Sequence, residues 1–156
     1  MQFAAIDFET TGFENGGTNE PWQLGIAFVE DSRIVKTMEF FFDVEGAPER
    51  ASGPDSLGTI QSSYETWAPH LEGRRLVAHN IACERTILTR AAPLAPWGPW
   101  VDTMRLAKAR YPRLPSYALG DLCEMFGCIP DIPGRTWHDG LYDAVACANL
   151  AIQLAI

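Results

Sequence analysis

The chain has 156 residues, of which 47% are hydrophobic and 21% charged, a composition typical of one globular domain with a real core. The formal net charge of −8 argues against a protein that coats nucleic acid. The N-terminus has no basic start followed by a long apolar run, and no apolar stretch approaches the length of a membrane span, so we expect a cytoplasmic protein without a membrane partner.

Three strand-like segments open the chain. Alternating or continuous apolar residues predict strands over 2–9, 22–30 and 33–44, the last two separated by a short polar turn at 31–32. Gly, Asn and Pro content predicts loops over 14–21 and 45–56. A weak periodicity predicts a helix over 57–71.

The second half of the chain alternates between predicted strands and predicted helices. We expect a buried strand over 74–80, a helix over 82–92, a strand end running into a helix over 101–112, and a short helix over 118–127. Apolar residues at 141, 145, 148, 152 and 155 predict a final amphipathic helix. This order predicts the α/β class, with a mixed five-stranded sheet flanked by helices in one domain over residues 1–156.

Basic residues are unevenly distributed. Residues 74–113 contain eight Arg or Lys and two acidic residues, so this segment carries +6 and the remainder −14. A solvated basic face is the ordinary explanation, and a local contact surface for phosphates is the functional one.

The four cysteines have neither CxxC spacing nor a paired framework. Buried free thiols in a reducing compartment are therefore expected.

Asp7 and Glu9 lie two residues apart in the first predicted strand. Because strands alternate their faces, both side chains should point the same way. Two adjacent carboxylates repel each other and resist burial, which calls for a compensating positive charge.

Two further carboxylates lie where predicted helices begin. Glu84 is in the first turn of one helix, and Asp143 follows His138 by five residues at the start of the last helix. The helix dipole alone would favour acids at these positions. All these residues, however, lie at the edges of regular elements, where sites on open α/β sheets usually form.

Three segments of the chain resemble, in order, the motifs of the DEDDh (DnaQ-like) 3′–5′ exonucleases. They are Asp7-Phe8-Glu9-Thr10 for DxET, residues 79–84 for HNxxFD, and residues 138–143 for HxxxxD. Residues 100–104 also resemble the short strand-then-helix segment between the second and third motifs. The resemblance spans nearly the whole chain and implies a ribonuclease H-like fold.

The resemblance implies a two-metal hydrolysis of phosphodiester bonds at the 3′ end of single-stranded DNA or RNA. Asp7, Glu9, Glu84 and Asp143 would be the metal ligands, since oxygen ligands select hard ions such as Mg²⁺ or Mn²⁺. Asp7 would bridge both ions, Glu9 and Asp143 would share the ion nearer the nucleophile, and Glu84 would hold the second. His138 would be the general base, because histidine titrates near neutrality.

The resemblance also implies substrate contacts. The turn at Thr10, Thr11 and Gly12 would meet the terminal nucleotide, and Phe13 occupies the position of an apolar wedge against the last bases. Core packing of Phe13 is an alternative. His79 and Asn80 end a strand beside the site and would shape it by hydrogen bonds. Single-stranded 3′ ends, and a DNA polymerase or other replication or repair protein, are the implied partners.

The sequence departs from the family pattern in the second motif and beyond. Glu84 replaces the family's aspartate and is one methylene longer, and Cys83 replaces an aromatic residue. An HGI-type stretch found in many relatives is missing before residue 74. Two other functions therefore stay open: a catalytically weakened module that binds nucleic acid ends or a polymerase partner, and a metal-dependent hydrolase acting on nucleotides.

Overall fold

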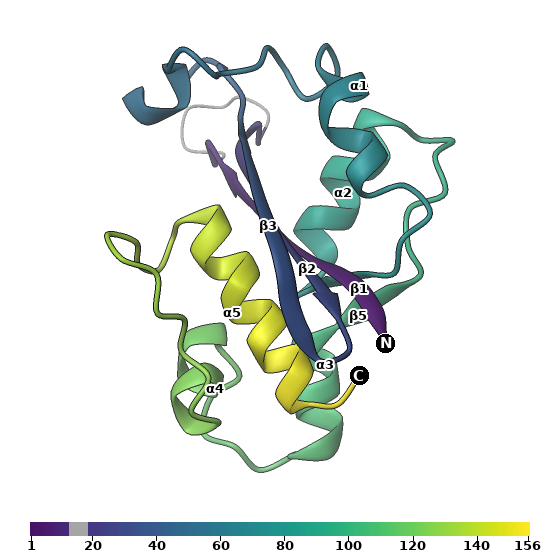
Figure 1. Ribbon diagram of the computed structural model, residues 1–156, viewed down its shortest axis with the longest axis vertical. Helices are drawn as coiled ribbons and strands as arrows, with labels where there is room; N and C mark the ends of the chain where they lie inside the picture. Colours follow the sequence, from purple (N-terminus) through teal and green to yellow (C-terminus); the bar gives the residue numbers. More distant parts are fainter. Residues whose placement is uncertain (13–18) are drawn as a thin grey trace.

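The computed structural model describes residues 1–12 and 19–156 as a mixed β-sheet with helices on both faces (Figure 1). The sheet has five strands in the order β3-β2-β1-β4-β5. The α/β class and the mixed five-stranded sheet are confirmed. Within the described residues, no helix is both long and apolar enough to cross a membrane.

An antiparallel meander forms one half of the sheet. It consists of β1 (Gln2–Thr10), β2 (Pro21–Glu30) and β3 (Arg33–Phe41). Asp31 and Ser32 connect β2 to β3 with φ values of 48° and 61°, as the tight two-residue hairpin turn requires. β2 is buried along almost its whole length because it lies inside the sheet and both of its faces are covered.

The other half of the sheet is parallel. Here β4 (Leu76–Ala78) pairs with β1, and β5 (Trp100–Asp102) pairs with β4. Helix α2 (Ala82–Ala91) connects the two strands, and α3 (Thr103–Arg110) follows β5 directly. Helices α4 (Leu119–Met125) and α5 (Gly140–Gln153) complete the chain.

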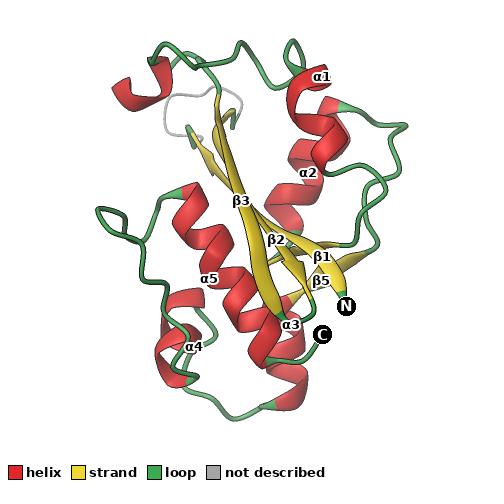
Figure 2. Ribbon diagram, viewed as in Figure 1, coloured by secondary structure: helices red, strands yellow, loops and turns green. Residues whose placement is uncertain are grey.

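Two hydrophobic cores lie on opposite faces of the sheet (Figure 2). Helices α3, α4 and α5 cover one face, where Phe3 and Ala5 of β1 are buried. Helix α2 and the short helix α1 (Tyr64–Trp67) cover the other face, where Ile6 and Phe8 are buried. The alternation along β1 therefore continues toward its end with Asp7 on the face that carries α5.

The predicted helix over 57–71 is wrong for most of its length. The structure has only α1, followed by the 3₁₀ helix η2 (Ala68–His70). Leu57 instead forms an isolated bridge with Phe42. The Ser62 and Ser63 hydroxyls donate to the Thr59 carbonyl, an arrangement that competes with regular helix formation.

Smaller differences concern element ends and one cysteine. The strands predicted over 33–44 and 74–80 are shorter, and the predicted loop over 45–56 contains the 3₁₀ helix η1 (Glu49–Ser52). All four cysteines are free thiols, as expected, but Cys83 is exposed rather than buried because it lies on the outer side of α2.

Candidate active site

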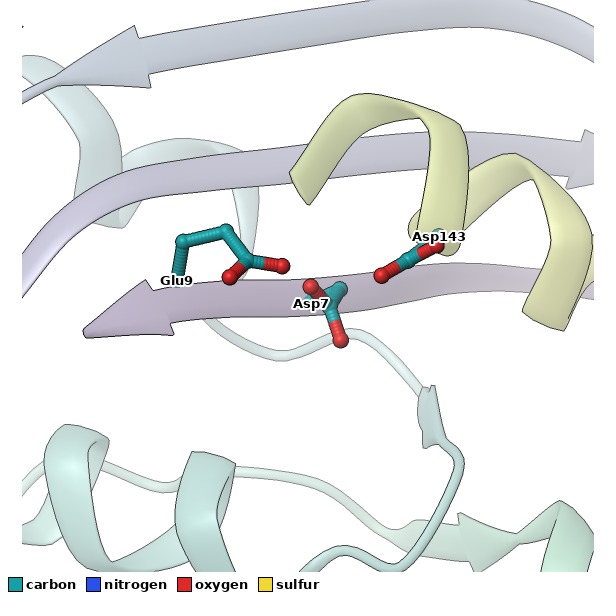
Figure 3. A group of neighbouring side chains, drawn as sticks. All are labelled: Asp7, Glu9 and Asp143. Atoms are coloured by element: carbon teal, nitrogen blue, oxygen red, sulfur yellow. The ribbon is translucent and has the colours of Figure 1, made fainter. Parts of the chain in front are cut away.

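Three carboxylates from two distant parts of the chain converge beside β1. Asp7 and Glu9 project from the end of β1, and Asp143 projects toward them from α5 (Figure 3). One oxygen of each residue lies within 4.8 Å of an oxygen of the others. The side chains of Asp7 and Glu9 lie on one face of the strand, so the structure brings together these predicted site residues.

The first turn of α5 sets the position of Asp143. Asp139 caps this helix, and its carboxylate accepts hydrogen bonds from the backbone N–H groups of Leu141 at 3.0 Å and Tyr142 at 3.1 Å. Asp143 accepts a hydrogen bond from the His138 backbone N–H at 3.2 Å. The helix start, His138 and Asp143 therefore form one connected unit.

This unit packs closely against β2. A Cβ atom placed on Gly25 would lie 2.0 Å from the Gly140 carbonyl oxygen, so only glycine fits there. The side chain of Gln23 is completely buried, and its Oε1 accepts the Gly140 backbone N–H at 2.9 Å. The contact fixes the distance between α5 and the sheet, and with it the approach of Asp143 to Asp7.

A network of charged side chains also holds the start of α5. Arg135 donates to Glu39 of β3 at 2.6 Å and to Asp139 at 3.1 Å. Arg50 donates to Asp139 at 3.2 Å and to the His138 carbonyl at 3.4 Å. Sequence reasoning missed these residues. Asp139 at a helix start carries a capping signal, and Arg135 is only four positions from it, but 89 positions separate Arg50 from Asp139 and 96 separate Arg135 from Glu39.

Glu84 approaches the site from α2. Its side chain is only 4% exposed, and Oε2 has no hydrogen-bond partner within the described part of the chain. Burial raises the pKa of Glu84 to about 7, although backbone hydrogen bonds at Glu84 and Phe8 act in the opposite direction. Glu84 lies outside the group of three carboxylates within 4.8 Å, yet its charge is the second largest cause of the raised pKa of Asp7.

The electrostatics of the cluster are unfavourable without a cation. Burial, followed by the charges of Glu84, Asp143 and Glu9, raises the pKa of Asp7 well above its ordinary value. Burial and Glu9 raise the pKa of Asp143 to about 6. Within the described residues, Asp7 Oδ2 and Asp143 Oδ1 are also buried without a hydrogen-bond partner. Buried, unpaired carboxylate oxygens in a cluster of acids fit a divalent metal ion.

His138 lies beside the carboxylates and is exposed to solvent. Its charge lowers the pKa of both Glu9 and Asp143, which shows that it is near them. It lines a cavity of about 480 Å³ together with Trp137 and Asp143. Its φ of 67° is in the left-handed region, a conformation that costs free energy for a residue with a side chain.

The turn after β1 is held to the start of β2. Thr11 donates its backbone N–H to the Glu20 carbonyl at 2.9 Å, and Gly12 donates to Asn19 Oδ1 at 2.8 Å. Gly12 has a φ of 74°, which glycine adopts readily. Thr10, Thr11 and Gly12 therefore continue β1 directly past Glu9. Phe13 lies outside the described residues.

His79 and Asn80 follow β4 at the same edge of the sheet. Both ring nitrogens of His79 are engaged, with Thr103 Oγ1 at 2.8 Å and the Tyr117 carbonyl at 2.8 Å, and burial lowers the pKa of His79. Asn80 has a φ of 63°, and its backbone N–H donates to Asp102. These contacts connect β4 to α3 and to the segment before α4, a geometry that favours the predicted shaping role.

Two curated bacterial proteins are similar in sequence to the chain. A 3′-5′ exonuclease DinG from Staphylococcus saprophyticus is 28% identical over 96% of the chain, and a DNA polymerase III PolC-type from Halalkalibacterium halodurans is 24% identical over 96%. The chain spans only 18% and 11% of the lengths of these relatives. No protein-family model matches the sequence.

Solved structures of exonucleases are similar to the chain in fold. Exonuclease X in complex with 5′ overhanging duplex DNA is 25% identical with a TM-score of 0.67, and the match covers 97% of this chain and 90% of that one. The nuclease domain of 3′hExo, a DEDDh family member bound to rAMP, has a TM-score of 0.75 at 16% identity over 99% and 91% of the two chains. In sequence and in fold, the chain is therefore similar to 3′–5′ exonucleases of the DnaQ-like type.

Proposed function

We propose that the chain is a metal-dependent 3′–5′ exonuclease that hydrolyses phosphodiester bonds at the 3′ end of single-stranded DNA or RNA. One observation carries this proposal: Asp7, Glu9 and Asp143 converge, and buried carboxylate oxygens of Asp7 and Asp143 have no partner in the described part of the chain. Such an arrangement is costly in a folded protein unless a cation compensates the charge.

The four carboxylates would hold two divalent ions, Mg²⁺ or Mn²⁺. One ion could be shared by three carboxylates that lie close together, those of Asp7, Glu9 and Asp143. Glu84 approaches Asp7 from α2, a position that suits a ligand of the second ion. The ions, when bound, would supply positive charge that stabilises the attacking and leaving oxygens of the phosphodiester. Glu84 is one methylene longer than the aspartate of related proteins, and its burial keeps the longer side chain directed into the site.

His138 would take the proton from the attacking water. It is solvent-exposed, adjacent to Glu9 and Asp143, and held at its backbone by Asp143 and Arg50. These contacts engage the backbone of His138, and the residue lines the cavity described above. The imidazole would then act as general base.

The substrate's last nucleotide would lie at the turn formed by Thr10, Thr11 and Gly12, which continues β1 directly beyond Glu9. Hydrogen bonds at 2.8 and 2.9 Å hold this turn, so its backbone groups are preorganised for a ligand. The relative of PolC type is a DNA polymerase by its name, and we propose a polymerase or another replication or repair protein as the partner.

Digestion of 5′-labelled DNA and RNA 20-mers with Mg²⁺, Mn²⁺ or EDTA tests this function. A metal-dependent ladder is expected from the wild-type protein. His138→Ala and Asp143→Asn should each lose most of the activity, whereas the matched changes His70→Ala and Asp55→Asn, outside the acid cluster, should retain it. The preferred strand would identify the substrate as DNA or RNA.

Other outcomes have distinct meanings. Binding of the labelled 20-mers by folded protein without a ladder in either metal would contradict the enzyme and support the weakened binding module. Cleavage of the p-nitrophenyl ester of thymidine 5′-monophosphate without shortening of any 20-mer would support a hydrolase acting on nucleotides. Recovery of a ladder in Glu84→Asp would show that the longer side chain had silenced the site.

A further inference from the structure

A groove of about 890 Å³ runs along α2 and past the start of α3, next to the carboxyl ends of β4 and β5. Its lining includes these polar and basic residues: Asn80, Arg85, Thr86, Thr89, Arg90 and Arg105. It lies within the basic segment 74–113, so the structure collects part of that segment's charge in one hollow.

The charges of the groove are not balanced. Arg85 and Arg105 are exposed, and neither forms an ion pair with a carboxylate within residues 1–12 and 19–156. Asp102 is the acid that lines the groove, and its carboxylate already accepts backbone N–H groups from Asn80 at 3.1 Å and Met104 at 2.9 Å. The arginines therefore present free guanidinium groups on a protein whose net charge is −8.

The groove adjoins the acid cluster. β4 pairs in parallel with β1 through Val77 and Ala5, and β5 pairs with β4 through Asp102 and Ala78, so β4 and β5 end beside the part of β1 that carries Asp7. Two inter-strand spacings separate β5 from β1, a distance of about 10 Å. Glu84 and Arg85 are consecutive on α2, and the first is buried toward Asp7 while the second is exposed in the groove.

We propose that this groove binds backbone phosphates of the same single strand whose 3′ end lies at the acid cluster. The inference rests on the proposed function. Guanidinium groups bind phosphate oxygens in a planar, bidentate manner, and the hydroxyls of Thr86 and Thr89 are further donors. No aromatic side chain is among the described residues that line the groove, so it suits the backbone rather than stacked bases.

Continuity along the sheet edge favours the substrate strand over a second strand. A strand bound at the acid cluster meets repulsion from the carboxylates, and the arginines of the groove add compensating positive charge to that of Arg50, which lies near Glu9. The contacts are to phosphates, so binding in the groove should not depend on base sequence.

Fluorescence anisotropy with 5′-fluorescein-labelled dT20 and dT3 in EDTA tests the groove without catalysis. The double variant Arg85→Gln/Arg105→Gln should weaken dT20 binding about tenfold and reduce the salt dependence of log K by about 1.4. Arg33→Gln/Lys36→Gln, with the same loss of charge near the opposite edge of the sheet, should change dT20 binding less than twofold. dT3, which offers only two internucleotide phosphates, should lose less affinity than dT20 in Arg85→Gln/Arg105→Gln.

Kinetics in Mg²⁺ give an independent readout. The ratio of kcat/KM for dT20 to that for the p-nitrophenyl ester of thymidine 5′-monophosphate should fall about tenfold in Arg85→Gln/Arg105→Gln and stay constant in Arg33→Gln/Lys36→Gln. Equal losses of dT20 binding in both double variants, or no loss in either, would overturn the inference. Weakened binding only of a duplex with a recessed 3′ end would assign the groove to a second strand instead, and so would also overturn it.

Failure of the groove and failure of the exonuclease have different signatures. If the wild-type protein cleaves but both double variants bind dT20 equally, the groove inference is wrong and the enzyme stands. If the wild-type protein cleaves nothing but dT20 binding still depends on Arg85 and Arg105, the groove stands and the proposed activity is wrong.

Discussion

Replacing Glu84 by glutamine should stabilise the metal-free protein at alkaline pH. The Glu84 side chain is 4% exposed, and burial raises its pKa from 4.5 to about 7. A pKa difference of this size, at about 1.4 kcal/mol for each pKa unit, corresponds to roughly 3 kcal/mol of unfolding free energy. Glutamine has nearly the same shape but cannot ionise, so it avoids the cost of burying the charge.

The sign of the pH dependence follows from the direction of the pKa change. The folded state holds the Glu84 proton more tightly than the unfolded state. The contribution of this proton to folding stability is therefore complete below pH 4.5 and is lost as the pH rises through about 7. Glu84→Gln should therefore match the wild-type protein near pH 4.5 and exceed it by roughly 3 kcal/mol at pH 8.5. For a chain of this length that corresponds to about 6–12 °C in Tm.

Urea unfolding in EDTA between pH 4.5 and 8.5, followed by tryptophan fluorescence, measures this difference. Glu65→Gln is the matched control because Glu65 is exposed on α1. A gain in Glu84→Gln that does not vary with pH, or a loss of stability at pH 8.5, would refute the view that Glu84 is a buried carboxylate awaiting a cation.

Three further predictions concern the metal ions and the start of α5. Saturating Mg²⁺ should raise Tm more at pH 8 than at pH 5, because protons compete with the ion for the carboxylates. At a Mg²⁺ concentration of 100 times Kd, the gain in unfolding free energy is about 2.7 kcal/mol. Equal increases of Tm in thermal melts at both pH values would contradict this prediction. Gly25→Ala should cost about 3 kcal/mol in urea unfolding because its Cβ would meet Gly140, whereas Gly53→Ala, with open space around it, should be nearly neutral. Asp139→Ala should lower the unfolding free energy by about 2 kcal/mol, because it removes the helix cap and a partner of Arg135. It should also lower kcat for 20-mers. An unchanged kcat would show that the cap does not position the catalytic residues.

Local rules were sufficient for the β1 part of the site. Strand alternation alone predicted that Asp7 and Glu9 share a face, and the structure places them so, with one oxygen of each within 4.8 Å of the other. Asp143 could be assigned to the site only through its place in the HxxxxD motif, because helix periodicity does not indicate which element α5 faces. The helix predicted over 57–71 was wrong because the serine hydroxyls and the bridge from Leu57 to Phe42 compete with a weak apolar period.

The sequence by itself determined the order of the elements, the α/β class and the residue types of the acid cluster, because these depend on periodicity and on spacing within short segments. Only the tertiary structure decided how α5 is held, through Gln23, Arg50 and Arg135, and how Arg85 and Arg105 share a groove. These contacts join residues up to 117 positions apart, where sequence spacing carries no information about distance. Close packing of α5 on β2 and the shared edge of parallel strands bring such residues together.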